Sequence, residues 1–143
     1  MKLYSREKWD LEQPQDQWAS SCAFCLNLSD TKNQYTIWRW KYWLICHNKY
    51  PVLGLKNQLM AVPRRHVKMA YQLNNDEMLE YPTVEKFIYD FYKWGPYFTF
   101  MRESIQNRSL EHIHYHFLPG KINYKHLEYL LLEQGFTDQS EEG

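Results

Sequence analysis

Three features of the sequence predict an α+β domain. Five short segments are rich in the β-branched and aromatic residues that favour strands, and two longer ones carry apolar residues at helical spacing. In the last strand segment, residues 111–118, histidine alternates with apolar residues. A chain of 143 residues is long enough for one domain with a substantial core. We expect an irregular N-terminal segment over 1–21, the domain over 22–136 and an acidic tail over 137–143.

The first three strands are expected in the first half of the chain. Residues 35–38 and 43–47 have strand composition, and residues 58–62 form a third segment of this kind. The intervening loop contains Pro51 and Gly54, which favour turns. Three tryptophans lie around the first strand: Trp38, Trp40 and Trp43. They either line a ligand pocket or pack in the core or an interface.

The main helix is expected to be short. Asn74 followed by acidic residues is typical of a helix start, but Pro82 should break or restart the helix and leave it spanning 83–93. Its apolar stripe consists of Val84, Phe87, Ile88 and Phe91. Gly95 and Pro96 end the helix, and a strand is expected over 97–102.

A closing helix is expected over about 123–134. Its apolar residues, Leu127, Leu130 and Leu131, should face the core. Gly135 follows as a typical C-terminal cap.

The alternating histidines are the strongest functional signal. On a strand, His112, His114 and His116 share one face. At about 3.3 Å per residue, the outer two lie roughly 13 Å apart, so one metal ion cannot bind all three. A division of roles therefore fits better than a single metal site, because imidazole suits attack and proton transfer near neutral pH. The alternative is a half-buried strand with a polar outer face.

The run His112-Ile113-His114-Tyr115-His116-Phe117-Leu118 fits the histidine-triad pattern HφHφHφφ, where φ is apolar. The sequence here resembles the histidine-triad (HIT) superfamily of nucleotide hydrolases and transferases. Two further stretches agree in order and spacing, the CxxC of residues 22–25 and the segment from Cys46 to Val67 with its Pro-basic-basic-His motif. The resemblance spans about residues 22–120. It implies a five-stranded antiparallel sheet with two main helices, and a homodimer.

By itself, the CxxC motif can be interpreted as half of a zinc site, as a redox pair or as a coincidence. A thioredoxin-like context for a redox pair is missing. The resemblance implies the remaining ligands of a structural zinc site, which would consist of Cys22, Cys25, His66 and His112. Cys46 is interpreted as a buried small residue, and His47 and His126 as surface or satisfied side chains.

The resemblance also implies a mechanism. His114 would attack the α-phosphorus of a nucleotide and form a covalent nucleotidyl-histidine, which water then cleaves. The backbone carbonyl of His112 would fix the tautomer of His114, and His116 would donate a hydrogen bond to the phosphate or leaving group.

Four further residues are candidates for nucleotide binding. The resemblance places Asn48 at a ribose-contacting position and Ser109 beside the phosphate or leaving group, whereas local turn or cap hydrogen bonds are the alternatives. Arg102 and Arg108 would bind additional phosphates, or else lie exposed in a loop. A phosphate-binding role would favour a dinucleoside polyphosphate over a nucleoside phosphoramidate.

Composition sets the remaining limits. Seventeen basic and seventeen acidic residues give no net charge, so neither a nucleic acid nor a membrane surface is an expected partner. Three cysteines and the lack of a long apolar run fit a cytoplasmic protein. The predicted function is a HIT-type nucleotidyl hydrolase or transferase, and the alternative is a nucleotide-binding regulatory or scaffold protein. A DNA-end deadenylase is disfavoured, because such a protein would have a basic surface and a further zinc module.

Overall fold

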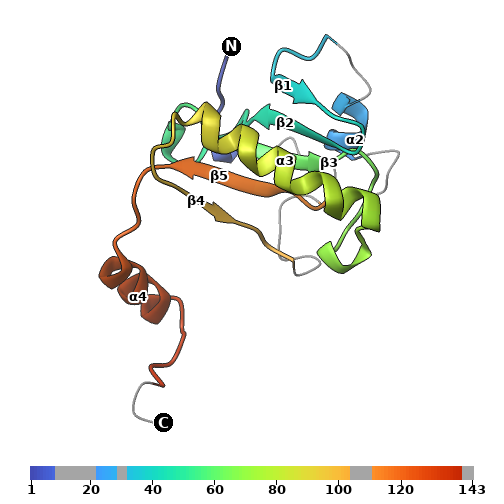
Figure 1. Ribbon diagram of the computed structural model, residues 1–143. Coiled ribbons are helices and arrows are strands. Elements are labelled where there is room, and N and C mark those ends of the chain that lie inside the picture. The colour runs from blue at the N-terminus through green and yellow to red at the C-terminus, as the bar shows by residue number, and fades with distance from the viewer. Residues whose placement is uncertain (9–21, 29–31, 104–110, 140–143) are drawn as a thin grey trace.

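Five strands form one antiparallel sheet in the computed structural model, which describes residues 1–8, 22–28, 32–103 and 111–139 (Figure 1). The strands are β1 Thr36–Arg39, β2 Trp43–His47, β3 Leu59–Pro63, β4 Tyr97–Phe100 and β5 Tyr115–Pro119. Their order is β1-β2-β3-β5-β4, and every neighbouring pair is antiparallel. This confirms the predicted α+β class with a five-stranded antiparallel sheet.

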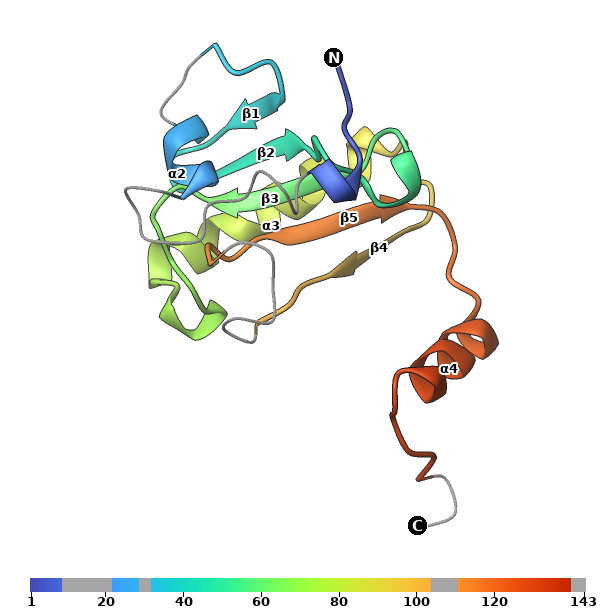
Figure 2. The ribbon, with the colours of Figure 1, turned by 180° about the vertical axis from the view of Figure 1, so that it is seen from behind.

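Helices of very different length connect and cover these strands. They are α2 Ala23–Leu28, the 3₁₀ turns η1 Val52–Gly54 and η2 Ala70–Gln72, α3 Asn75–Phe91 and α4 Tyr124–Glu133. The longest, α3, lies across one face of the sheet, and α2 lies near β1 and β2 (Figures 1 and 2). In the described residues, no helix is long and apolar enough to cross a membrane.

The strand that carries the histidines is shorter than predicted. Regular pairing begins at Tyr115, so His112 and His114 precede β5 and only His116 lies within it. The preceding residues are held by other contacts: the backbone N–H of Ile113 donates to the carbonyl of Val67 at 2.7 Å. Opposite them, Pro63 has no N–H to donate, and its carbonyl accepts from the ring of His112. The alternating pattern therefore predicts the directions of the side chains, but the backbone hydrogen bonds of the sheet begin later than the pattern indicates.

Helix α3 is also longer than predicted, because it continues through Pro82. On the N-terminal side, Asn74 and Glu77 form a reciprocal capping box, and the backbone carbonyl of Glu77 accepts from the Trp43 indole at 2.7 Å. On the C-terminal side, Val84 and Ile88 are fully buried against the sheet. Attachment on both sides of Pro82 outweighs the loss of one helical hydrogen bond, so the predicted break at this residue is wrong.

The two faces of the sheet have separate apolar contacts. The α3 face holds the main core, which consists of Trp43, Ile45, Leu59, Ala61, Val84, Ile88 and Phe117. Phe87 and Phe91 pack against it, which confirms the predicted stripe of α3. The opposite face carries a smaller cluster of Leu44, Cys46, Met60 and Val62, with Phe24 of α2 packed against it. His116, the partner of Met60 across the sheet, also lies on this second face.

Helix α4 begins and ends close to the predicted positions but does not cover the core. It projects away from the sheet (Figures 1 and 2), and none of its residues is buried. Leu130 is 53% exposed and Leu131 37% exposed, so the prediction that they face inward is wrong. The chain leaves β5 through Gly120, whose φ of +129° turns it away from the sheet. Helical periodicity gives an apolar stripe but not the surface it meets.

A paired substitution on α3 tests whether the helix is anchored beyond Pro82. We expect Ile88→Ala to lower the free energy of unfolding by about 3 kcal/mol, because a fully buried side chain is removed. Leu79→Ala, at a position 78% exposed on the same helix, should change it by less than about 0.5 kcal/mol. Urea unfolding of both variants is the measurement, and equal effects would contradict this packing.

Candidate functional site

One row of side chains crosses the sheet on the face opposite α3. Its backbone partners are Thr36 with Cys46, Cys46 with Met60, Met60 with His116, and His116 with Phe100. Directly paired residues project from the same face, so this row takes in all five strands. The ring of Phe100 stacks on that of His116, with 4.6 Å between centroids and 8° between planes.

Burial makes His116 a neutral imidazole. It is 8% exposed, and burial is the main reason that its pKa falls to about 2, followed by the charges of His114, Arg102 and Arg6. The positive charges of Arg102 and Arg6 disfavour a further one on the ring. His116 can therefore donate one hydrogen bond near pH 7 while carrying no charge.

The tautomer of His114 is set by its backbone neighbour. Its Nδ1 lies 2.7 Å from the carbonyl oxygen of His112, and a carbonyl can only accept, so Nδ1 carries the proton. The lone pair is then on Nε2, the nitrogen with the character of a nucleophile. The ring packs against Phe24 at 4.9 Å and His116 at 4.7 Å, which limits its movement.

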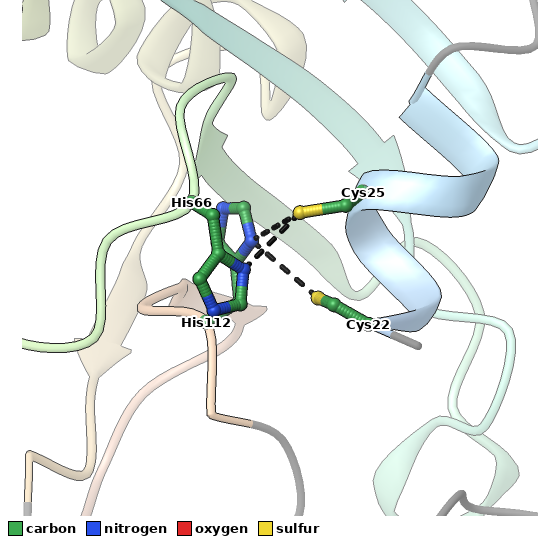
Figure 3. A group of neighbouring side chains, drawn as sticks. All are labelled: Cys22, Cys25, His66 and His112. Carbon is green, nitrogen blue, oxygen red and sulfur yellow. Dashed lines mark hydrogen bonds between the residues drawn. The ribbon is translucent and has the colours of Figure 1, made fainter. Parts of the chain in front are cut away.

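Beside this row, two cysteines and two histidines converge from three parts of the chain (Figure 3). Cys22 and Cys25 come from the start of α2, His66 follows β3 and His112 precedes β5. The Cys25 sulfur lies 3.1 Å from Nδ1 of His66 and 3.4 Å from Nδ1 of His112, and the Cys22 sulfur lies 3.5 Å from the latter. The four ligand atoms are within 4.8 Å of one another, an arrangement that could hold a metal ion.

The cluster is set up for metal binding by its surroundings. Nε2 of His112 donates to the carbonyl of Pro63 at 2.7 Å, which leaves Nδ1 with a lone pair directed at the sulfurs. Burial, followed by the charge of Lys68, lowers the pKa of His66 and favours its neutral form. Burial and the neighbouring Cys22 raise the pKa of the Cys25 thiol to about 12, so binding of a metal there releases a proton.

Two arginines hold the loop that presents His66. Arg64 donates to the carbonyl of Trp40 at 2.9 Å. Arg65 forms an ion pair of 2.6 Å with Glu77, a carboxylate only 1% exposed at the start of α3. The two basic residues of the Pro-basic-basic-His motif therefore attach this loop to the sheet and to α3.

A pocket opens above the row. Asn48, His114 and His116 line it, so the structure brings these three predicted residues together. The Asn48 side-chain oxygen accepts from the N–H of Tyr50 at 2.9 Å, which is the Asx turn considered as the alternative. Its Nδ2 is nevertheless buried without a hydrogen-bond partner among the described residues and so can still donate to a ligand.

Other predicted residues lie elsewhere. Ser109 and Arg108 are outside the described residues, and Arg102 is exposed after β4, close enough to affect the pKa of His116. Trp43 is a core residue and Trp40 packs against the core, as the alternative interpretation held. Cys46 is buried, as predicted, and burial raises its pKa to about 12.

Sequence reasoning missed three residues that line the pocket: Arg6, Phe24 and Lys49. Phe24 lies inside the CxxC, where helical spacing places it on a different side from the two cysteines, so its direction was predictable. Arg6 reaches the pocket by a contact with Tyr50, 44 residues away, and nothing in its local sequence indicates this. His47, predicted to be a surface or satisfied side chain, has a half-buried ring that contacts Phe91, and it also lines the pocket.

Comparison with known proteins identifies the fold. No protein-family model matches the sequence, and no curated protein matches it. Solved structures do match: a histidine triad nucleotide-binding protein from Candida albicans aligns with a TM-score of 0.60 at 15% identity, over 80% of this chain and 94% of its own. A HIT family hydrolase from Legionella pneumophila Philadelphia 1 aligns with a TM-score of 0.56 at 18% identity, over 71% of this chain and 94% of its own.

A histidine triad protein from Clostridium difficile aligns with the same TM-score of 0.56 at 19% identity, over 71% of this chain and 92% of its own. The chain therefore has the histidine-triad fold that its sequence predicts. At these identities the likeness concerns the fold. The implied homodimer, the cytoplasmic location and the domain boundaries remain predictions.

The lowered pKa of His116 predicts how stability depends on pH. Below pH 6.5, the ordinary pKa of histidine, the unfolded chain binds a proton that the folded chain does not, so this contribution to stability is present above pH 6.5 and is lost toward pH 2. Between pH 7.0 and 5.5, the free energy of unfolding should fall by about 1 kcal/mol less in His116→Gln than in the original chain. Urea unfolding of both proteins at both pH values measures this, and an equal fall in the two proteins would contradict it.

Proposed function

We propose that the chain is a nucleotide hydrolase or transferase that acts through a covalent nucleotidyl-histidine at His114. The observation that carries this proposal is the 2.7 Å hydrogen bond from Nδ1 of His114 to the carbonyl of His112, within a pocket. This bond keeps the lone pair on Nε2, which a nucleophilic imidazole requires. Similarity to a HIT family hydrolase and to a histidine triad nucleotide-binding protein supports the substrate class.

In the first step, the lone pair of His114 Nε2 forms a bond to the α-phosphorus, and the bond from phosphorus to the leaving-group oxygen breaks. The leaving group takes that electron pair, and the ring, still protonated on Nδ1, becomes positively charged. The carbonyl of His112 stabilises this charge through the existing hydrogen bond. In the second step, water attacks phosphorus, the bond from phosphorus to nitrogen breaks, and the water proton passes to solvent. An acceptor other than water would make the protein a transferase.

The other residues would bind and orient the nucleotide. Neutral His116, next to His114, would donate a hydrogen bond to a phosphate oxygen as charge develops. The unpartnered Nδ2 of Asn48 would donate to a ribose oxygen. We assign Arg102, Arg108 and Ser109 to the phosphates or the leaving group, which favours a dinucleoside polyphosphate or a related nucleotide.

We propose a structural zinc ion for the cluster of Cys22, Cys25, His66 and His112. Sulfur at about 2.3 Å and nitrogen at about 2.0 Å from a tetrahedral zinc lie roughly 3.5 Å apart, close to the separations of 3.4 and 3.5 Å from Nδ1 of His112. Zinc would supply cross-linking rather than reaction chemistry, because four protein ligands leave no site for water. His112 would then act through its backbone carbonyl, as a positioning residue for His114.

The covalent step is tested by rapid-quench mass spectrometry of the intact protein with dinucleoside polyphosphates and nucleoside phosphoramidates. We expect an adduct of one nucleoside monophosphate in the original chain, and release of monophosphate that falls by about 10³-fold or more in His114→Ala. His126→Ala, at an exposed histidine of α4, is the matched control and should retain both. Bound nucleotide with neither adduct nor product would instead favour the nucleotide-binding scaffold.

Metal content tests the zinc site. Protein purified without added metal should contain about one equivalent of zinc, and Cys25→Ala should contain less than roughly half an equivalent and unfold at a lower temperature. Cys46→Ala removes a thiol outside the cluster and should retain the metal. The same low content in all three proteins would refute the proposal.

A further inference from the structure

Residues 1–8 lie against one end of the pocket. The N–H of Tyr4 donates to the carbonyl of Lys49 at 2.8 Å, and the hydroxyl of Tyr35 donates to the carbonyl of Lys2 at 2.6 Å. Arg6 donates to the carbonyl of Tyr50 in a longer hydrogen bond of 3.4 Å. These contacts join the start of the chain to β1 and to the loop after β2, on the side of the sheet opposite α3 (Figure 2).

Positive charge is concentrated at this end of the pocket. Three ammonium groups surround the ring of Tyr4: those of Lys8 at 4.1 Å, Lys49 at 4.9 Å and Lys2 at 5.1 Å. Arg6 and Lys49 line the pocket itself, and among the described residues no acidic side chain lines it. Overall the sequence has equal numbers of acidic and basic residues, but the Arg and Lys side chains Arg6 and Lys49 line the pocket without an acidic counterpart among the described residues. Such a concentration favours an anionic ligand.

The basic side chains retain capacity for a ligand. A guanidinium has five N–H donors, and among the described residues Arg6 uses one of them, in the hydrogen bond to Tyr50. The ammonium of Lys49 lies over the rings of Tyr35 and Tyr50, at 5.5 and 5.6 Å, and in the described part of the chain it has no oxygen partner. Next to them lies the buried Nδ2 of Asn48, which has no hydrogen-bond partner among the described residues and which we assign to the ribose. Arg6 and Lys49 thus present further donors, and phosphate oxygens would satisfy them.

We propose that Arg6 and Lys49 form a second phosphate subsite, separate from the phosphate that His114 attacks. The preferred substrate is then a nucleotide with at least one additional phosphate, an inference that rests on the proposed function. That phosphate is either one that follows the α-phosphate in the nucleotide's polyphosphate or one attached to a ribose hydroxyl. Both place an anionic phosphate group against a forked guanidinium and an ammonium. The influence of Arg6 on the pKa of His116 agrees with its nearness to the triad.

Calorimetric titration in the His114→Ala background tests the subsite without turnover. The probes are a nucleoside 5′-monophosphate, the 5′-triphosphate, the 3′,5′-bisphosphate and inorganic tripolyphosphate. Arg6→Gln and Lys49→Met should weaken binding of a ligand with an extra phosphate by about 10-fold, and that of the monophosphate by less than about 2-fold. Lys121→Met, at an exposed lysine outside the pocket, should change neither, and the selective loss should shrink at high salt.

The pattern of losses decides among the outcomes. If only triphosphate binding is weakened, the extra phosphate belongs to the polyphosphate of the nucleotide. If only bisphosphate binding is weakened, it belongs to the ribose. Equal weakening of all ligands, or none, would overturn the subsite, because Arg6 and Lys49 would then serve only to hold residues 1–8. Tripolyphosphate binding that depends on Arg6, with no nucleotide binding, would refute the proposed function but retain the subsite. Binding of none of the probes would overturn both.

Discussion

The whole site depends on the three contacts of one buried residue. His112 is fully buried, and its two ring nitrogens and its carbonyl point to different partners. Nε2 donates to Pro63 at the end of β3, Nδ1 faces the two cysteine sulfurs, and the carbonyl accepts from His114. A displacement of this side chain would therefore disturb the sheet, the metal-ligand cluster and the tautomer of His114 together. This explains why the proposed nucleophile can lie outside the regular strand and still have a defined orientation.

The metal-ligand cluster and the core are coupled through the loop after β3. Arg65 connects that loop to Glu77, and Glu77 also completes the N-terminal cap of α3 and accepts the Trp43 indole through its carbonyl. A buried carboxylate is costly unless it is paired, so Arg65 and the cap stabilise a charge that the fold would otherwise exclude. His66 is therefore held by the same contacts that allow α3 to continue past Pro82. Local rules for proline fail here because tertiary contacts on both sides of it outweigh them.

The sequence predicted the structure correctly where a local pattern is compatible with a single arrangement of the backbone and its side chains. Alternation places His114 and His116 side by side, and the strand composition of β1 to β4 gave their positions within two residues. It failed where the answer depends on a partner. The apolar stripe of α4 predicts a helix but not its exposed position, and the ring of His47 meets Phe91 of α3 only in the fold. Arg6 could not be found at all, because a lone arginine in a polar segment has no periodicity to indicate what it contacts.

Electrostatics connects the two ends of the pocket. Burial and the nearby arginines keep His116 neutral, so the triad itself offers little positive charge to a nucleotide phosphate. A phosphate group carries one or two negative charges, and transferring it into a pocket where His114 and His116 are each less than 9% exposed is unfavourable without compensation. In the proposed function, Arg6 and Lys49, which line the pocket, and Arg102 after β4 would supply that compensation while remaining partly hydrated. The proposed attack requires a neutral His114, and it would be compatible with binding an anion because the positive charge is carried by residues outside the triad.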